Sequence, residues 1–419
     1  MKKFLSIVLV LVMLVSCVAA FSACGKTNDN DTDTDTGVAN DTGSAEVNKY
    51  ADIKIGFIFL HDEKSTYDLN FIRAAEAAKV ALGLSDDQVI IKTNIDESDD
   101  CYEAAADLAD MGCDIVFADS FGHEDFMIKA AREFPNVQFC HATGTKAHTE
   151  GLANFHNAFA DIYEGRYLAG VAAGLKLNEM IANGEFTAEE AKIGYVGAFP
   201  YAEVKSGYTS FYLGAKSVCP SVVMDVQFTG SWYDANAERE TAIALINGGC
   251  KLISQHADSM GAPGACEENN VPNVSYNGST VADCPNTFIV SSAINWQPYF
   301  EYIVNCVADG ETIAADWCAG IEEGSVVLSA INEAAAAEGT AAKLEEVKKA
   351  LADGTLKVFD TANFTVNGET LTSYMADVDT DAAYTGDTEV VSDGYFHESE
   401  YRSAPYFDVN IDGITLLNN

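Results

Sequence analysis

Four polar side chains follow a short apolar run in the stretch 251–259, and their types and spacing suit the recognition of a small molecule. The run ends with Leu252 and Ile253, and the side chains after it are those of Gln255, His256, Asp258 and Ser259. In open α/β sheets, small ligands bind just beyond the carboxyl ends of the strands. The same order of strand, polar tip and helix occurs at 114–133, where the tip contains Asp119, Ser120 and Gly122. Two similar tips predict two similar lobes that face one pocket.

Aromatic and amide side chains follow most of the other predicted strands. They are Tyr67, Phe199, Trp232, Asn277 and Trp296, and Glu203 lies in the same kind of position. Aromatic faces stack on flat rings, and polar groups hydrogen-bond to ring edges. A single aromatic residue of this kind is more often a core residue than a ligand contact. Their repeated occurrence directly after strands predicts a site for a ring-shaped ligand.

Other chemistries find less support in the sequence. His141, His148 and His156 with Cys140 match no common zinc spacing. The chain contains no Gly-x-Ser-x-Gly, Gly-x-x-x-x-Gly-Lys or Gly-x-Gly-x-x-Gly motif. His256, Asp258 and Ser259 are too close together for a catalytic triad. We therefore expect no catalytic residue, metal or cofactor, and keep as an alternative an exported hydrolase that uses Asp258 and Glu203 as acid and base.

The elements that would position these residues alternate between strands and helices. We expect strands at 53–59, 89–91, 115–118 and 137–140, with helices at 71–82, 101–111 and 127–134 between them. A second series has strands at 193–196, 222–228, 252–254, 274–276 and 288–293, with helices at 204–216, 235–247, 265–269 and 298–308. This alternation predicts parallel sheets covered by helices on both faces.

The beginning of the chain has the features of an export signal. Lys2 and Lys3 precede an apolar run at 4–15, and small residues lead to Cys24. This arrangement resembles the bacterial lipobox, although Phe21 stands where an aliphatic residue is usual, and it implies that Cys24 is lipidated. We expect a signal peptide at 1–23 and a flexible acidic linker at 24–49, whose composition offers almost nothing apolar to bury. The protein would then be held on the extracytoplasmic face of the cell membrane.

The composition narrows the range of partners. The formal net charge of −40 argues against nucleic acid, whose phosphates require clusters of Lys and Arg. Of the eleven cysteines, nine lie after Cys24 and form no Cys-x-x-Cys pair. We interpret most of them as small buried apolar residues, and Cys266 with Cys284 is the pair to test first for a disulfide.

An ordered set of short motifs covers most of the region 54–302. They are Gly56-Phe57-Ile58, Ser65-Thr66-Tyr67, Ser120-Phe121-Gly122, His141-Ala142-Thr143-Gly144, Gly165-Arg166-Tyr167-Leu168-Ala169-Gly170, Ile193-Gly194-Tyr195-Val196, Ala198-Phe199-Pro200, Ser231-Trp232-Tyr233-Asp234, Gln255-His256-Ala257-Asp258-Ser259, Tyr276-Asn277 and Asn295-Trp296. The set resembles the basic membrane protein (BMP) family of ABC-transporter substrate-binding lipoproteins, and more closely its purine or nucleoside branch.

This resemblance implies a type I periplasmic-binding-protein fold, with two Rossmann-like lobes of parallel sheet joined by a hinge. Lobe 1 would comprise 50–165, with 290–330 crossing back to it, and lobe 2 would comprise 166–289. Residues 330–419 would pack on the lobes, with an irregular acidic excursion at 372–403. The implied partners are a small-molecule ligand and the permease and ATPase of an ABC transporter.

The resemblance also implies roles for individual residues. Phe199, Trp232 and Tyr67 would stack on a purine base or nucleoside, and Asp258, Asn277 and Ser120 would hydrogen-bond to the ring edges. Relatives usually have Trp where Ser65 stands, so that stacking wall would be either missing or replaced by Phe121. Trp296 completes the expected set. A sugar or a flavin-like ligand remains an alternative, because aromatic walls stack on these rings too.

Overall fold

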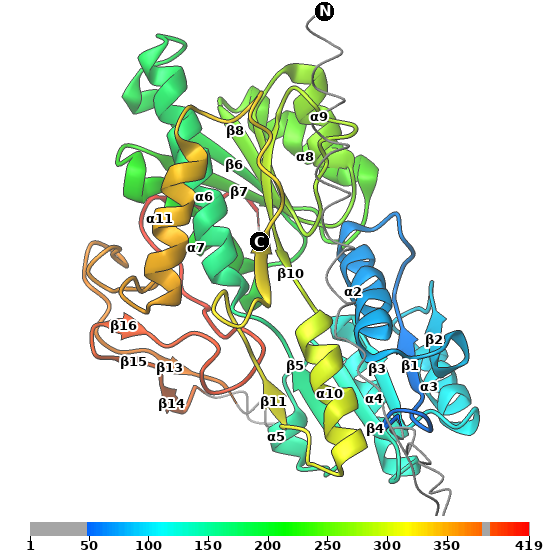
Figure 1. Cartoon of the computed structure of the whole chain (residues 1–419). Coiled ribbons are helices and arrows are strands. Elements are labelled where there is room, and N and C mark those ends of the chain that lie inside the picture. The colour runs from blue at the N-terminus through cyan, green and yellow to red at the C-terminus, as the bar shows by residue number, and fades with distance from the viewer. Residues whose placement is uncertain (1–47, 379–385, 419) are drawn as a thin grey trace, which may run out of the picture. The chain divides into compact units, whose positions relative to one another are not determined.

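The computed structural model describes residues 48–378 and 386–418. The expected signal peptide, Cys24 and most of the expected linker lie outside this range. Residues 48–419 form one compact unit, and it contains two parallel-stranded α/β lobes (Figure 1). Within the described residues, no helix combines the length and apolar character that a membrane span requires.

The first lobe is built on a parallel sheet with the strand order β11-β5-β4-β3-β1-β2. Its strands are β1 (Ile55–Ile58), β2 (Val89–Lys92), β3 (Ile115–Ala118), β4 (Gln138–Ala142), β5 (Phe155–Ala158) and β11 (Asp316–Trp317). Its helices are α2 (Thr66–Leu82), α3 (Asp99–Asp110), α4 (Glu124–Glu133), α5 (Ala147–Glu150) and α10 (Gln297–Asp309). Successive side chains of a strand point to opposite faces. Phe117 therefore packs with α2 and α10, whereas Val116 packs with α3 and α4.

The second lobe has a sheet with the order β12-β10-β9-β8-β6-β7-β17. Its strands are β6 (Lys192–Gly197), β7 (Val223–Phe228), β8 (Leu252–His256), β9 (Asn273–Tyr276), β10 (Phe288–Ile294), β12 (Val326–Leu328) and β17 (Ile414–Leu416). Only β12 runs antiparallel to its neighbour. The helices of the second lobe are α6 (Ile162–Ala182), α7 (Ala202–Val218), α8 (Ala235–Asn247) and α9 (Gly261–Asn269). Helices α6 and α7 pack so closely that a Cβ added at Gly170 would lie 2.0 Å from the carbonyl oxygen of Phe211.

The chain passes between the two sheets after β5, after β10 and after β11. The expectation that 290–330 as a whole returns to the first lobe is wrong. Strand β10 extends the second sheet beside β9, and β12 pairs with β10. Only α10 and β11 lie in the first lobe, where Phe300 packs edge-on against Phe57 at 4.9 Å.

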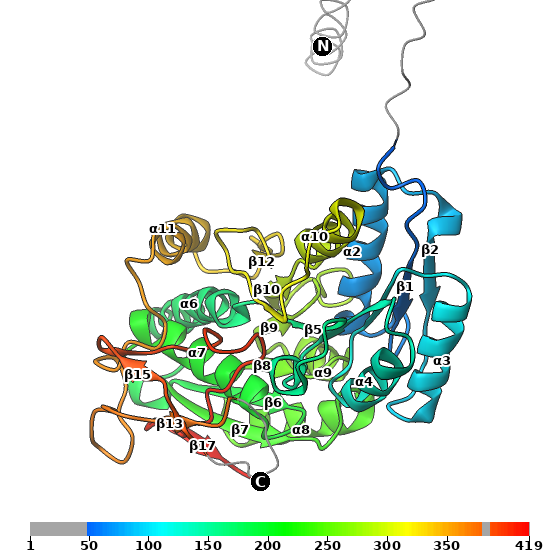
Figure 2. The same cartoon turned by 90° about the horizontal axis from the view of Figure 1, so that it is seen from below.

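The C-terminal part of the chain is attached mainly to the second lobe. Helix α11 (Thr340–Ala352) lies beside α6 (Figure 2), and β17 adds to the sheet edge by pairing with β7. The described part of 372–403 forms β13 (Met375–Ala376) with β14 (Thr388–Glu389), and β15 (Val391–Ser392) with β16 (Tyr395–Phe396). We expected an irregular surface segment here, but Val390, Phe396 and Glu398 are buried. The prediction failed because the segment is acidic overall, so the sequence pattern did not indicate that a few of its apolar residues cover the second lobe.

The cysteines of the described residues are all free, and eight of these nine are buried. Cys266 and Cys284 are among the buried ones, so the structure does not contain the candidate disulfide. Burial raises the pKa of Cys284 to about 11, as befits a small apolar core residue.

Candidate ligand-binding site

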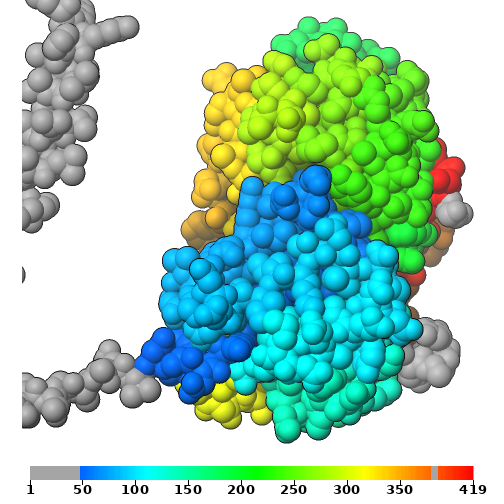
Figure 3. All heavy atoms as spheres, turned by 90° about the vertical axis from the view of Figure 1, so that its right-hand side faces the viewer, coloured from blue at the N-terminus to red at the C-terminus, as the bar shows by residue number. Residues whose placement is uncertain are grey.

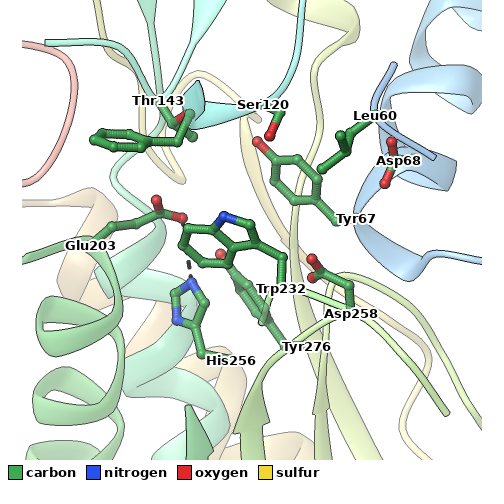
Figure 4. A pocket seen from close by; sticks show the side chains of 11 residues that line it. Leu60, Tyr67, Asp68, Ser120, Thr143, Glu203, Trp232, His256, Asp258 and Tyr276 are labelled. Atoms are coloured by element: carbon green, nitrogen blue, oxygen red, sulfur yellow. Dashed lines mark hydrogen bonds and ion pairs between the residues drawn. The ribbon is translucent and has the colours of Figure 1, made fainter. Parts of the chain in front are cut away.

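A pocket lies where the strand ends of the two lobes meet (Figure 4). The first lobe lines it with Leu60, Tyr67, Asp68, Ser120, Phe121 and Thr143, and the second with Glu203, Trp232, His256, Asp258 and Tyr276. Six of these residues lie at the last residue of a strand or within two residues after it, and Tyr67, Asp68 and Glu203 lie in the first turn of a helix. Parallel strands bring their carboxyl ends to one edge of a sheet, so residues far apart in sequence converge there.

The first lobe, blue to cyan, and the second lobe, green, touch each other (Figure 3). The backbone N–H and the hydroxyl of Thr66 donate to the carbonyl oxygen of Asp258, at 3.1 and 3.2 Å. Asn70 Nδ2 also donates to Asn277 Oδ1 at 3.2 Å. These contacts hold the start of α2 against the second lobe, as expected of a fold that encloses its ligand by hinge motion.

The start of α2 forms one wall of the pocket. Ser65 is the N-cap of this helix, its hydroxyl oxygen accepting from the N–H of Asp68, and its hydroxyl donates to the Asp68 carboxylate at 2.5 Å. This capping fixes the first turn, on which Tyr67 lies. The Tyr67 hydroxyl donates to the carbonyl oxygen of Asp119 at 2.7 Å, and its ring packs edge-on against Phe71. Tyr67 is therefore held as a rigid wall, and Ser65 supports it.

Aromatic side chains of the second lobe form the opposite wall. Trp232 is partly buried and lines the cavity. Phe199 packs edge-on against it, with ring centroids 5.1 Å apart, and stacks on Tyr201 at the same distance. Phe199 does not line the cavity itself, so it supports Trp232 from behind. Phe121 lines the pocket as expected, and it reaches Tyr201 across the lobes at 5.5 Å.

Two residues expected in the site lie elsewhere. Trp296 is 1% exposed in the core of the first lobe, where it stacks on Phe71 at 4.5 Å, so its proposed ligand contact is wrong. Asn277 does not line the cavity and connects the lobes through Asn70; its φ of 62° is one that Asn tolerates better than most residues. Ser120 does line the pocket, but its hydroxyl donates to Glu97 at 2.5 Å.

The carboxylate of Asp258 points into the pocket (Figure 4). Its backbone N–H donates to the carbonyl oxygen of Trp232, and its own carbonyl oxygen accepts from Thr66. Its side-chain oxygens have no hydrogen-bond partner within the described part of the chain. Burial raises the pKa of this carboxyl well above its ordinary value, and the charge of Asp68 adds to the effect. A buried polar group without a protein partner costs free energy unless a ligand or water satisfies it.

Asp68 and Asp119 form a carboxyl pair behind Tyr67. Burial, reinforced by Asp68, raises the pKa of Asp119 well above its ordinary value. Asp119 Oδ1 accepts from the N–H of Leu60 at 3.1 Å, while Oδ2 has no donor facing it. Two carboxylates held close together repel each other, and protonation of one of them relieves this repulsion.

Glu203 and His256 form the other polar pair of the pocket. His256 Nε2 lies 3.3 Å from Glu203 Oε1, and burial lowers the pKa of His256. Both residues follow predicted strands in the sequence and were expected among the polar side chains at the strand ends. Leu60, Asp68, Thr143 and Tyr276 were not expected as ligand contacts. Tyr276 was not identified because it ends an apolar strand, where an aromatic side chain fits the core as well as it fits a ligand site.

The described residues that line the pocket provide three carboxyl groups and neither Lys nor Arg. No group of three or more His, Cys, Asp or Glu side chains suited to a metal ion exists among the residues that the structure describes. The pocket combines aromatic walls with hydrogen-bond acceptors, an arrangement that suits a flat, neutral or cationic ligand rich in N–H or O–H groups.

Comparison with known proteins agrees with this fold. Residues 79–362 match the family model described as ABC transporter substrate-binding protein PnrA-like. A purine-binding protein of Brucella abortus is 31% identical over 280 residues, which cover 66% of this chain and 75% of that protein. A putative ABC transporter glucose-binding protein of Haloferax volcanii is 32% identical over 215 residues, or 51% of each chain.

A solved structure supports the fold alone. An ABC transporter solute-binding protein from Aeropyrum pernix superposes with a TM-score of 0.61 at 16% identity, covering 73% of this chain and 93% of that one. The expected two-lobed periplasmic-binding-protein fold is thereby confirmed. The matching family consists of binding proteins, so the hydrolase alternative is wrong. The chain belongs to the PnrA-like, or BMP, family of ABC-transporter substrate-binding proteins.

Proposed function

We propose that this substrate-binding protein captures a purine base or nucleoside and presents it to the permease of its ABC transporter. The observation that carries the proposal is the pocket itself, in which Tyr67 and Trp232 come from opposite lobes and the Asp258 carboxylate has no hydrogen-bond partner among the described residues. Aromatic side chains stack on a base, and a carboxyl group suits the N–H groups at its edge. The similarity to a protein named as purine-binding supports the same choice.

Capture depends on the two lobes moving together. A ligand between Tyr67 and Trp232 contacts both lobes and therefore favours the form in which they touch. The hydrogen bonds of Thr66 to Asp258 and of Asn70 to Asn277 form only when the lobes are close. Closure around the ligand would be the signal that the permease recognises.

A sugar is the second candidate ligand. The relative from Haloferax volcanii is named as a putative glucose-binding protein, and a Trp ring such as that of Trp232 also stacks on the apolar face of a pyranose. The carboxyl groups of the pocket accept hydroxyl hydrogens as readily as N–H hydrogens.

A thermal-shift screen of the purified protein separates these candidates. The panel contains purine bases, nucleosides, pentoses, hexoses and riboflavin. A ligand that binds only the folded state stabilises it by about 2.7 kcal/mol at a hundredfold excess over Kd. We expect Tm to rise with purines or their nucleosides. A rise with sugars or riboflavin alone would contradict the purine proposal and keep the transport role.

We also propose that Cys24 is lipidated and anchors the protein on the extracytoplasmic face of the membrane. The support is the basic start, the apolar run 4–15 and the small residues before Cys24. A Cys24→Ser variant should be lost from the membrane fraction of its host. Unchanged membrane association of that variant would contradict the anchor.

A further inference from the structure

The pocket contains an imbalance of hydrogen-bonding groups that restricts its ligand further. Its three carboxyl groups are those of Asp68, Glu203 and Asp258. The nearby cation, Arg166, is fully buried and does not line the cavity. Its guanidinium donates to Ser254 Oγ at 2.7 Å and to other groups inside the second lobe. The site therefore offers the ligand its carboxyl groups together with the Tyr276 hydroxyl, which has no partner among the described residues, and keeps its guanidinium for the fold.

Asp68 is less available than the other two carboxylates. It accepts from the backbone N–H of His61 at 2.7 Å and from the hydroxyl of Ser65. Asp258 has no partner for its carboxylate among the described residues, and Glu203 has only His256. Glu203 and Asp258 are thus the acceptors left for a bound molecule.

The position of His256 fixes the orientation of Glu203. The His256 side chain is 3% exposed, and its Nδ1 faces the backbone of α7, where a Cβ on Gly207 would lie 2.6 Å away. In the part of the chain that the structure describes, Nδ1 has no hydrogen-bond partner. A neutral imidazole has one N–H, and only Nε2 has an acceptor in reach, so the proton belongs on Nε2 and is donated to Glu203 Oε1. Glu203 Oε2 then remains open to the ligand.

We propose that Glu203, oriented by His256, accepts a hydrogen from an exocyclic amino group, so that the site selects amino-substituted purines such as adenine or guanine. The inference rests on the proposed purine function. A ring without the amino group leaves a carboxylate oxygen unsatisfied inside the closed pocket. A ring with a carbonyl oxygen in that place sets two acceptors against each other. Both situations weaken binding.

Titration calorimetry with matched ligand pairs tests the proposal. The pairs are adenine with unsubstituted purine, and guanine with hypoxanthine, which differ only by an amino group. We expect at least one amino-bearing member to bind about 10- to 100-fold more tightly than its partner, the range for a hydrogen bond to a charged group. Glu203→Gln should reduce this ratio towards one, because its amide N–H₂ faces the ligand when its oxygen accepts from His256.

Further variants distinguish a positioning role from a structural one. Glu103→Gln, on the exposed side of α3, changes the net charge equally and should leave the ratio unchanged. His256→Leu should lower the ratio, whereas His256→Gln keeps an N–H near the position of Nε2 and should retain more of it. A general loss of folding would weaken both members of a pair and leave their ratio intact.

The outcomes separate this proposal from the one on which it rests. Ratios near one in the wild-type protein, or a large ratio that Glu203→Gln leaves unchanged, would overturn the role of Glu203 while purine binding stands. Failure of every purine to bind would overturn both proposals. If Glu203→Gln does not fold, the wild-type ratios alone still decide whether the amino group is recognised.

Discussion

Two buried carboxyl groups, Asp258 in the pocket and Glu398 in the C-terminal segment, show how similar burial serves different purposes. They are 6% and 2% exposed, and burial raises both pKa values. Ser206 and Ser399 donate to the two oxygens of Glu398, whereas the Asp258 oxygens have no partner among the described residues. The protein supplies the hydrogen bonds of Glu398, so we interpret this carboxyl group as structural. The described residues supply none to the Asp258 carboxyl oxygens, so we expect a ligand to do so.

The tryptophans repeat this contrast. Trp296 is enclosed in the first lobe and stacks on Phe71, whereas Trp232 is partly buried, lines the cavity and is supported by Phe199. Substitutions in one class should change stability, and substitutions in the other should change affinity. The predictions below test this division.

The largest effect is expected for Trp296→Ala. Removing a large aromatic side chain from a packed core leaves a cavity and costs about 3 to 5 kcal/mol of unfolding free energy. Urea denaturation should measure this loss. If the variant keeps its stability but no longer binds purines, Trp296 belongs to the site after all.

The carboxyl group of Glu398 should make the free energy of unfolding depend on pH. Burial raises the pKa of Glu398 from 4.5 to about 7, so the native state holds this proton more tightly than the unfolded chain does. This proton therefore stabilises the native state fully below about pH 4. The stabilisation, up to about 3 kcal/mol of unfolding free energy, is lost as the pH rises through 7. Comparing unfolding free energies of the wild type and Glu398→Gln between pH 5 and 8 isolates it. Equal slopes of unfolding free energy against pH for the two proteins would contradict the prediction.

Trp232→Ala should lower ligand affinity and leave stability nearly unchanged, the opposite of Trp296→Ala. Loss of a stacking surface is expected to cost about 1 to 3 kcal/mol of ligand affinity, with little change in unfolding free energy because the side chain is only partly buried. Calorimetric titration and urea denaturation of the same preparation provide both quantities. An unchanged Kd with a clear loss of stability would place Trp232 in the core.

The sequence predicts the lobes well because each strand is a short apolar run followed by a helical pattern. It cannot separate Trp232 from Trp296, since both follow a strand and only the direction of the side chain differs. It also fails for β17, whose pairing with β7 is a contact between segments almost two hundred residues apart. The pairing of Glu203 with His256 depends on the distance between α7 and β8, which no local pattern encodes.

The most direct test of purine stacking is tryptophan fluorescence of the wild type and of Trp232→Phe, titrated with adenine, guanine and inosine. The phenyl ring preserves an aromatic wall, so calorimetry should still detect binding by the variant. We predict that a purine quenches the wild-type emission and that most of this quenching disappears in Trp232→Phe. Quenching of equal size in both proteins, or no binding of any purine to the wild type, would contradict the account.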